Sequence, residues 1–282
     1  MPFHLTPKIW IDVVPEFLRE DKRLEEVSEY DRQLFDLCTH CLIIEYEADA
    51  LNSPDLNWQG KETRPVEYAN LELAYLANIA FWLQHPSPIS FTSVFHMREM
   101  PEYGKFIIQA SQRCNGFLCH PNDVNQRIRD QDLESARNLF TSLANVPRET
   151  SVWTALRSTA AAFQSDGEEI RYLLLWVAIE ALFGTSMEIK FRISQRLAFF
   201  VGKDKSEARA IYDQAKKAYD FRSRVAHGTW KSDKTSTALT ATTEMLLRRA
   251  LICLVSDGAI AGLFFGGNDK RDSYLDELVF SL

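Results

Sequence analysis

The sequence predicts a mainly all-α protein, and three observations support this fold class. Of the 282 residues, 46% are hydrophobic and 25% are charged, which is typical of a soluble chain that buries a core. Apolar residues recur at steps of three and four over most of the chain. Only residues 89–97 alternate as a strand does. We therefore expect helices throughout and one small strand pair, formed by residues 89–97 and 105–108.

Residues 1–147 are predicted as a mostly helical N-terminal region without a recognisable function. Helical spacing covers residues 26–50 and 67–83. Between them, residues 51–65 carry Asn, Pro and Gly breakers, which predict a loop. The pair Val146-Pro147 is the expected domain boundary, because helix follows helix beyond it.

Residues 148–282 are predicted as a second, helical domain. Turn residues divide its apolar pattern, and Gly184 fits a helix C-terminus. The expected helices span residues 148–164, 168–183, 186–201, 206–224, 236–262 and 273–280.

Charge is unevenly distributed along the chain. The formal net charge of −7 argues against a protein that coats nucleic acid or anionic membrane with its whole surface. By position, the net charge is −9 for residues 1–147, +3 for residues 148–228 and −1 for residues 229–282. Any contact with a polyanion is therefore expected in the middle block.

The sequence favours a cytoplasmic protein without a membrane segment. Arg248, Arg249 and Asp257 interrupt the most apolar stretch, and the N-terminus lacks the pattern of a signal peptide. An odd number of cysteines favours reduced thiols over a disulfide framework. The five are Cys38, Cys41, Cys114, Cys119 and Cys253.

A zinc site is the alternative interpretation of these cysteines, since His40 and His120 adjoin them. We expect no metal, because Cys38 and Cys41 lie within a predicted helix, where buried thiols act as small apolar residues. No phosphate-binding glycine loop or Gly-x-Ser-x-Gly elbow is present, so we also expect no cofactor.

The segment 222–228, Arg-Ser-Arg-Val-Ala-His-Gly, is the strongest chemical signal. Arg222 and His227 lie about 140° apart on a straight helix, so both reach one site only where the helix ends or two chains meet. Gly228 is expected to end the helix. The alternative is a helix cap and a surface ion pair without catalytic meaning.

One Arg and one His suit cleavage of RNA by attack of the 2′-hydroxyl on the neighbouring phosphate. Imidazole moves the protons, and guanidinium holds the phosphate oxygens as charge grows on them. The reaction requires the ribose hydroxyl, so DNA is not a substrate. Since one His does not readily serve as base and acid together, a C2 dimer that brings two copies together is attractive.

Three motifs in order resemble the HEPN superfamily, in particular its Apea-like branch. They are Trp-x-Ala-x-Glu-x-Leu-Phe at residues 176–183, Ser-x-Arg-x-Ala at 194–198 and Tyr-x-x-Arg-Ser-x-x-x-His-Gly at 219–228. The resemblance covers about residues 148–282.

This resemblance implies a four-helix up-down bundle that dimerises through its motif-bearing helices. It also implies a metal-independent endoribonuclease of toxin, abortive-infection or antiphage systems, with a protein trigger or antitoxin as a further partner. Arg222 and His227 match the catalytic pair, Ser223 the following polar residue and Glu180 the acidic residue of the preceding helix. Some members are not nucleases, so a dimer that binds RNA, a nucleotide or a protein is the alternative.

Basic residues near the proposed site are candidates for binding RNA phosphates, although Lys216 and Lys217 also fit a solvated helix face. Glu180 lies in an apolar run and needs a buried partner, either Arg222 or Arg224. Tyr219 is expected in the core, and Trp230 is expected beside the site. The phosphate-binding candidates are Lys190, Arg192, Arg196, Lys216, Lys217 and Arg224.

Overall fold

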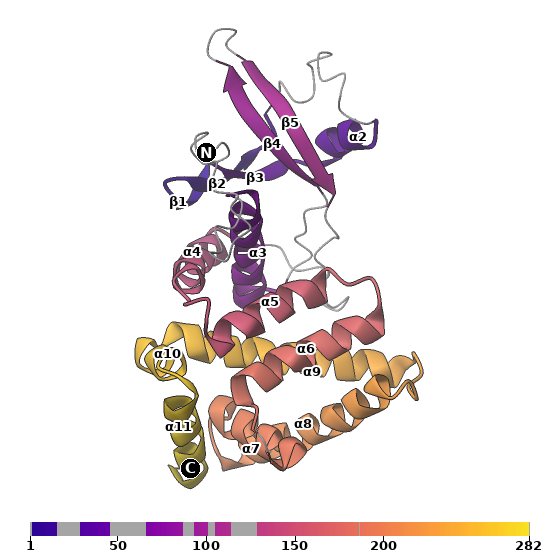
Figure 1. Ribbon diagram of the computed structural model, residues 1–282, viewed down its shortest axis with the longest axis vertical. Helices are drawn as coiled ribbons and strands as arrows, with labels where there is room; N and C mark the ends of the chain where they lie inside the picture. The colour runs from indigo at the N-terminus through magenta and orange to yellow at the C-terminus, as the bar shows by residue number, and fades with distance from the viewer. Residues whose placement is uncertain are drawn as a thin grey trace, which may run out of the picture. The chain divides into compact units, whose positions relative to one another are not determined.

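The computed structural model shows a small α/β unit and a larger helical unit (Figure 1). The first unit comprises Met1–Asn78 and Ser90–Gly116, and the second comprises Ile79–Ile89 and Phe117–Leu282. The structure describes residues 2–15, 29–45, 66–86, 93–100, 105–113, 129–185 and 187–281.

The units do not divide at the predicted boundary, Val146-Pro147. The end of α3 (Val66–Gln84) and all of α4 (Asp130–Ala144) belong to the helical unit instead. Arg248 holds the end of α3 there: its Nε donates to the carbonyl of Trp82 at 2.9 Å and its Nη2 to that of Gln84 at 3.0 Å. Spatial contact, which a composition shift does not reveal, sets this division.

The first unit confirms the predicted strand pair and adds a sheet that we did not expect. Strands β4 (Ser93–Met100) and β5 (Lys105–Arg113) form an antiparallel pair, with Ser93 opposite Arg113. Strands β1 (Phe3–Thr6), β2 (Ile9–Val13) and β3 (His40–Ile44) form a three-stranded antiparallel sheet. The predicted loop at 51–65 lies outside the described residues.

Within residues 29–45, which the structure describes, the helix predicted over residues 26–50 is present only as α2 (Glu29–Leu37), because β3 follows at residue 40. Apolar residues over a short run fit the helical and the extended period equally. Pairing with β2 decides the outcome: Ile43 lies opposite Trp10 and Cys41 opposite Asp12. Cys38 and Cys41 are therefore not in a helix.

The helical unit confirms most of the predicted helices. One predicted helix, residues 236–262, is instead divided at Asp257, whose extended backbone ends α9 and whose side chain caps α10 by accepting from the amide of Ala259 at 2.8 Å. The elements after α4 are α5 (Ser151–Phe163), α6 (Glu168–Phe183), α7 (Ile189–Val201), α8 (Lys205–Ala226), α9 (Lys234–Ser256), α10 (Gly258–Phe265) and α11 (Asn268–Ser281).

Helix α6 lies at the centre of this unit, in contact with α5, α7, α8 and α9. It is apolar around most of its circumference, and seven of its side chains, turned toward these helices, are buried. Tyr172 and Trp176 are among its fully buried side chains. Arg171 of α6 pairs with Glu244 of α9 at 2.6 Å, so both buried charges are compensated. No helix in the described ranges is long and apolar enough to cross a membrane.

Candidate functional site

Helix α8 ends where the sequence predicted. Gly228 has a φ of +67°, a left-handed conformation that residues with a Cβ rarely adopt. Its amide donates to the carbonyl of Val225 at 3.0 Å, and the amide of Thr229 donates to that of Arg224 at 2.9 Å. These two bonds form a Schellman motif. They place His227 at the C-cap, one residue beyond the last helical turn.

Arg222 is the partner of Glu180, one of the two partners that we considered. Its Nη2 donates to Oε2 of Glu180 at 3.4 Å, and its Nε lies 3.2 Å from Oε1 without hydrogen-bond alignment. Both side chains are about 30% exposed or less. The pair therefore joins α6 to α8 and keeps one side open to solvent.

Two aromatic rings, those of Tyr219 and Trp176, pack next to the Arg222 side of this ion pair. The Arg222 guanidinium lies 5.7 Å from the ring centre of Tyr219, and Tyr219 packs edge-on against Trp176 at 5.2 Å. Tyr219 is thus half-buried between the core and the guanidinium. We missed this role, which the spacing of Tyr219 and Arg222, one helical turn apart, indicates.

Partial burial shifts the pKa values of the Glu180 carboxyl and the Tyr219 hydroxyl. Burial raises the pKa of the Glu180 carboxyl above its ordinary value, and the neighbouring Arg222 charge opposes that rise. Burial also raises the pKa of the Tyr219 hydroxyl, and the Glu180 charge adds to the effect. The Arg222 charge therefore favours the carboxylate form of Glu180, against the effect of burial.

His227 is exposed and available to a ligand. Its ring has no hydrogen bond or ion pair with any residue in the described ranges, and none links it to Arg222. The sequence-predicted pair is therefore not joined within one chain. Its two members lie at one end of α8, with Arg222 positioned by Glu180 and His227 by the helix terminus.

The other residues of the segment have different surroundings. Ser223 is half-buried, and its carbonyl accepts the His227 amide at 3.1 Å. Arg224 is exposed and lies over the ring of Phe221 at 5.2 Å. Trp230 packs edge-on against the same ring at 6.3 Å. Arg224 is therefore accessible to phosphate, whereas Trp230 supports the end of α8.

All six predicted phosphate ligands lie on α7 and α8, which pack side by side (Figure 1). Lys190 pairs with Asp220 at 2.5 Å, and Arg192 lies 3.9 Å from the nearest carboxylates, on Glu188 and Asp276. Lys217 is exposed, and the Lys216 ammonium lies 5.1 Å from the ring centre of Tyr212. Acidic neighbours partly compensate this basic surface.

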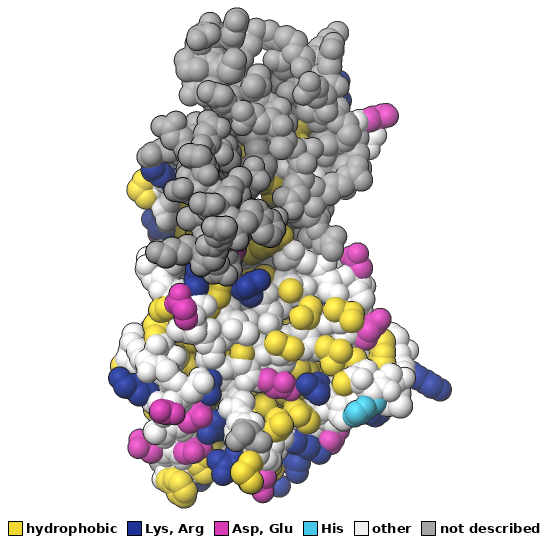
Figure 2. All heavy atoms as spheres, in the orientation of Figure 1, with side chains coloured by type: hydrophobic (Ala, Val, Ile, Leu, Met, Phe, Trp, Pro, Cys, Tyr) yellow, Lys and Arg dark blue, Asp and Glu magenta, His cyan; other side chains and the backbone are white. Residues whose placement is uncertain are grey.

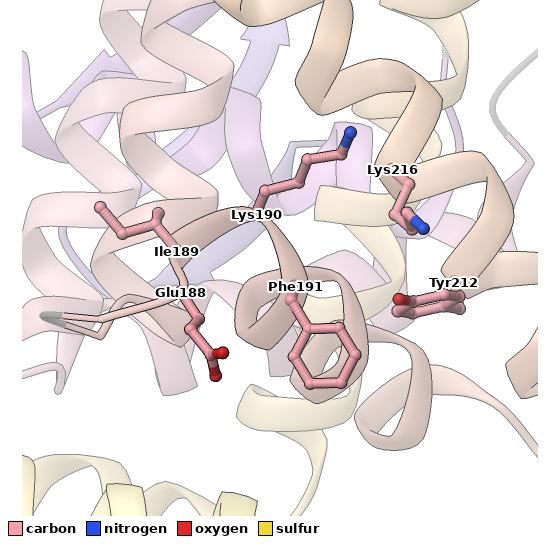
Figure 3. Close-up of a pocket in the computed structure, with 6 residues that line it drawn as sticks. All are labelled: Glu188, Ile189, Lys190, Phe191, Tyr212 and Lys216. Atoms are coloured by element: carbon pink, nitrogen blue, oxygen red, sulfur yellow. The ribbon is translucent and has the colours of Figure 1, made fainter.

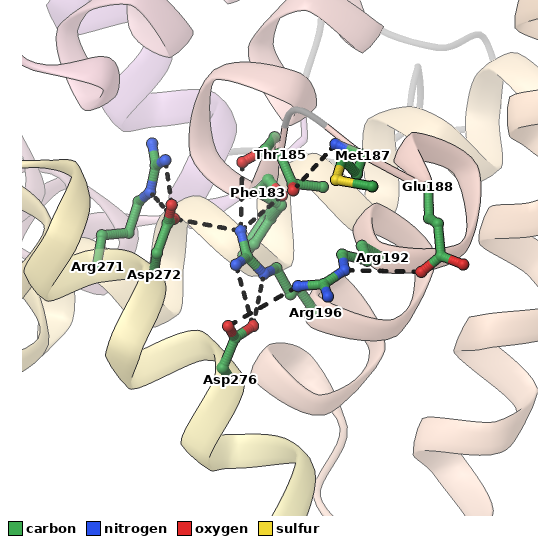
Figure 4. Close-up of polar contacts among 10 residues, drawn as sticks. Phe183, Thr185, Met187, Glu188, Arg192, Arg196, Arg271, Asp272 and Asp276 are labelled. Atoms are coloured by element: carbon green, nitrogen blue, oxygen red, sulfur yellow. Dashed lines mark hydrogen bonds and ion pairs between the residues drawn. The ribbon is translucent and has the colours of Figure 1, made fainter.

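Arg196 is a correction to the predicted phosphate ligands. Its side chain is 3% exposed and donates to Asp276 of α11 at 3.0 Å, to Asp272 at 3.2 Å and to the carbonyls of Phe183 and Gly184 (Figure 4). Every guanidinium nitrogen is thus engaged. Charge counted along the sequence does not show that α11 covers this residue, which joins α6, α7 and α11.

No cluster of three or more potential metal ligands forms within the described ranges. Cys41 lies on β3, and burial first, then the charges of Asp12 and Cys38, raise the pKa of its thiol to about 11. A thiol of such high pKa is a poor nucleophile and metal ligand. Cys114, Cys119 and His120 lie outside the described residues.

Apolar side chains form a stripe on the outer face of α6. Ile170 and Val177 are 50% and 40% exposed, and Leu174 and Ala181 lie between and beyond them on the same face. Figure 2 shows hydrophobic side chains gathered over α6. Glu180 borders this stripe, about 80° around the helix from Ile170. An exposed apolar surface thus adjoins the Arg222–Glu180 pair.

In comparison with known proteins, no family model, no curated protein and no solved structure matches the chain.

Proposed function

We propose that this protein is a metal-independent endoribonuclease of the HEPN type, active as a homodimer with a composite site. The observation that carries this proposal is the end of α8, where Glu180 orients Arg222 and a Schellman motif presents an accessible His227. The resemblance of the three motifs supports the same chemistry.

In the proposed mechanism, His227 of one chain takes the proton from the ribose 2′-hydroxyl. The 2′-oxygen attacks phosphorus, the bond to the 5′-oxygen breaks, and the second His227 donates a proton to that leaving oxygen. Arg222 stabilises the negative charge that grows on the phosphate oxygens. Glu180 positions Arg222, and Ser223 lies next to it as an orienting residue.

The α6 stripe supports the dimer in this proposal. Each chain supplies one His227, and the reaction uses a base and an acid at the same time. Apolar side chains exposed in a contiguous row favour burial against a second surface. Pairing of two stripes in C2 symmetry would place two Glu180–Arg222 pairs beside the same interface, because Glu180 borders the stripe.

The biological setting is proposed on the resemblance alone. A cytoplasmic RNA-cleaving protein of this type would arrest growth or act in antiphage defence, under the control of a protein trigger or an antitoxin. An acidic body with a local basic surface limits indiscriminate RNA binding.

Cleavage of a labelled RNA in EDTA tests the proposal. We expect His227→Ala to lower the rate about 10²–10⁴-fold and Arg222→Ala about 10²–10³-fold. Arg157→Ala, an exposed residue on α5, is the matched control and should cleave like the wild type. Equal rates for all four proteins, or loss of cleavage in EDTA with recovery on adding a divalent metal, would refute the mechanism.

A second candidate is a dimer that binds RNA without cutting it. It is favoured by the lack of any bond between His227 and Arg222 and by the engagement of Arg222 with Glu180. A gel-shift assay distinguishes the two functions. Binding that survives His227→Ala, with no cleaved product from the wild type, would support the binding module.

A further inference from the structure

An open pocket of about 440 Å³ lies between the start of α7 and the middle of α8 (Figure 3). We did not predict it from the sequence, since its walls come from two helices whose approach only the fold determines. Its lining residues are Glu188, Ile189, Lys190, Phe191, Tyr212 and Lys216.

The pocket presents aromatic surface to solvent. Phe191 is 47% exposed, so its ring offers aromatic surface to a ligand. Tyr212 stands edge-on to it, with ring centres 6.1 Å apart. In Figure 3, none of the other labelled side chains lies over the face of the Phe191 ring that is turned to the viewer. A flat aromatic ligand can stack there, as nucleobases do on proteins that bind single strands.

Cations surround these rings. Three carboxylates lie near them, but each is already close to a cation: Asp220 pairs with Lys190, Asp213 with Arg209, and Glu188 lies 3.9 Å from Arg192. Lys216 is different, because no carboxylate among the described residues pairs with it and its ammonium rests over Tyr212. It supplies an uncompensated positive charge for a phosphate.

The pocket and the proposed active site both involve residues of α8. Tyr212, Lys216, Tyr219 and Ser223 lie within about 60° of one another around the helix, so they form one face. Tyr212 precedes Arg222 by ten residues, or about 15 Å along the axis. At no less than about 3.4 Å for each stacked nucleotide, four or fewer nucleotides span this distance.

We propose that this pocket binds one nucleotide of a single-stranded RNA, four or fewer positions from the bond to be cleaved. Phe191 stacks on the base, and Lys216 contacts the adjoining phosphate. The direction of the strand and its link to cleavage rest on the proposed function, whereas nucleotide binding at Phe191 is tested independently of it.

The experiment uses the full chain and a 2′-O-methyl oligonucleotide, which cannot be cleaved. A series of oligonucleotides carries fluorescent 2-aminopurine at one position each. We expect the 2-aminopurine fluorescence to be quenched at one or two positions of the oligonucleotide. Phe191→Ala should abolish this quenching and weaken binding of the oligonucleotide about 5- to 100-fold, whereas Phe191→Trp should restore both. Lys216→Ala should weaken binding and reduce its salt dependence by about one phosphate contact.

Phe280→Ala and Lys270→Ala on α11 are matched controls for an exposed ring and an exposed ammonium, and neither should change binding. Wild-type affinity in Phe191→Ala would overturn the proposal even if the protein cleaves RNA. Conversely, Phe191-dependent quenching without any cleavage would support the nucleotide site and reject the nuclease. If adenosine monophosphate alone depends on Phe191 and the oligonucleotide does not, the pocket binds a free nucleotide, and the proposed RNA subsite is wrong.

Discussion

Replacing Arg196 by Met tests whether the Arg196 side chain stabilises the fold or binds RNA. The substitution keeps the apolar stem but removes the guanidinium, which joins α7 to Asp272 and Asp276 of α11 and to the end of α6. Breaking a fully buried ion pair typically costs about 3–5 kcal/mol. The two aspartates are 38% and 53% exposed and regain water, so we expect a loss of about 2–4 kcal/mol.

This loss is measured by thermal unfolding followed by circular dichroism. For a unit of this size, we expect the Tm to fall by about 4–15 °C. Arg192→Met is the matched control, because Arg192 lies on the same helix, is 42% exposed and is 3.9 Å from its nearest carboxylates. Its Tm should fall by less than about 4 °C. A wild-type Tm for Arg196→Met together with weaker RNA binding would refute the structural role.

Three further changes test the end of α8, the acidic group and the proposed interface. Gly228→Ala should destabilise the protein by about 1–2 kcal/mol, seen as a lower midpoint in urea, because its φ of +67° disfavours a Cβ. Burial raises the pKa of Glu180 above its ordinary 4.5, so the folded state binds this proton more tightly than the unfolded chain. The carboxyl therefore stabilises the fold most below about pH 4.5, and this contribution is lost as the pH rises through the folded value. We expect the free energy of unfolding of the wild type, measured by chemical denaturation, to fall relative to that of Glu180→Gln as the pH rises from about 4 to 7. Val177→Lys should convert the proposed dimer to monomer in sedimentation velocity and reduce cleavage with it.

Two of these changes have a matched control variant, and each of the last two has an outcome that would contradict it. Gly262→Ala, in the interior of α10 with open space for a Cβ, should stabilise by about 0.5–1 kcal/mol. A constant difference between the wild type and Glu180→Gln across the pH range would contradict the raised pKa. Met245→Lys changes an apolar side chain of similar exposure on α9 and should leave the sedimentation coefficient unchanged. If Val177→Lys also leaves it unchanged, α6 is not the interface.

The helical unit was largely predictable because its information is local. Periodic apolar residues and the glycine at 228 indicate where the helices lie and where α8 ends, without distant contacts. The prediction that Glu180 needs a cationic partner was confirmed for the same kind of reason: a carboxylate in an apolar run must be compensated. The three-stranded sheet was missed because β2 and β3 are separated by 26 residues and stabilise each other only by pairing.

By itself, then, the sequence determined a mainly helical protein with an acidic body, a helix that ends at His227 and a basic block around it. The tertiary structure alone decided which of those basic side chains remain accessible. Arg196 and Lys216 have the same formal charge, but α11 covers the first with two aspartates, while the second rests on the half-buried ring of Tyr212. The physical reason is that burial and ion pairing depend on neighbours distant in the chain, whereas helix formation depends on those one turn away.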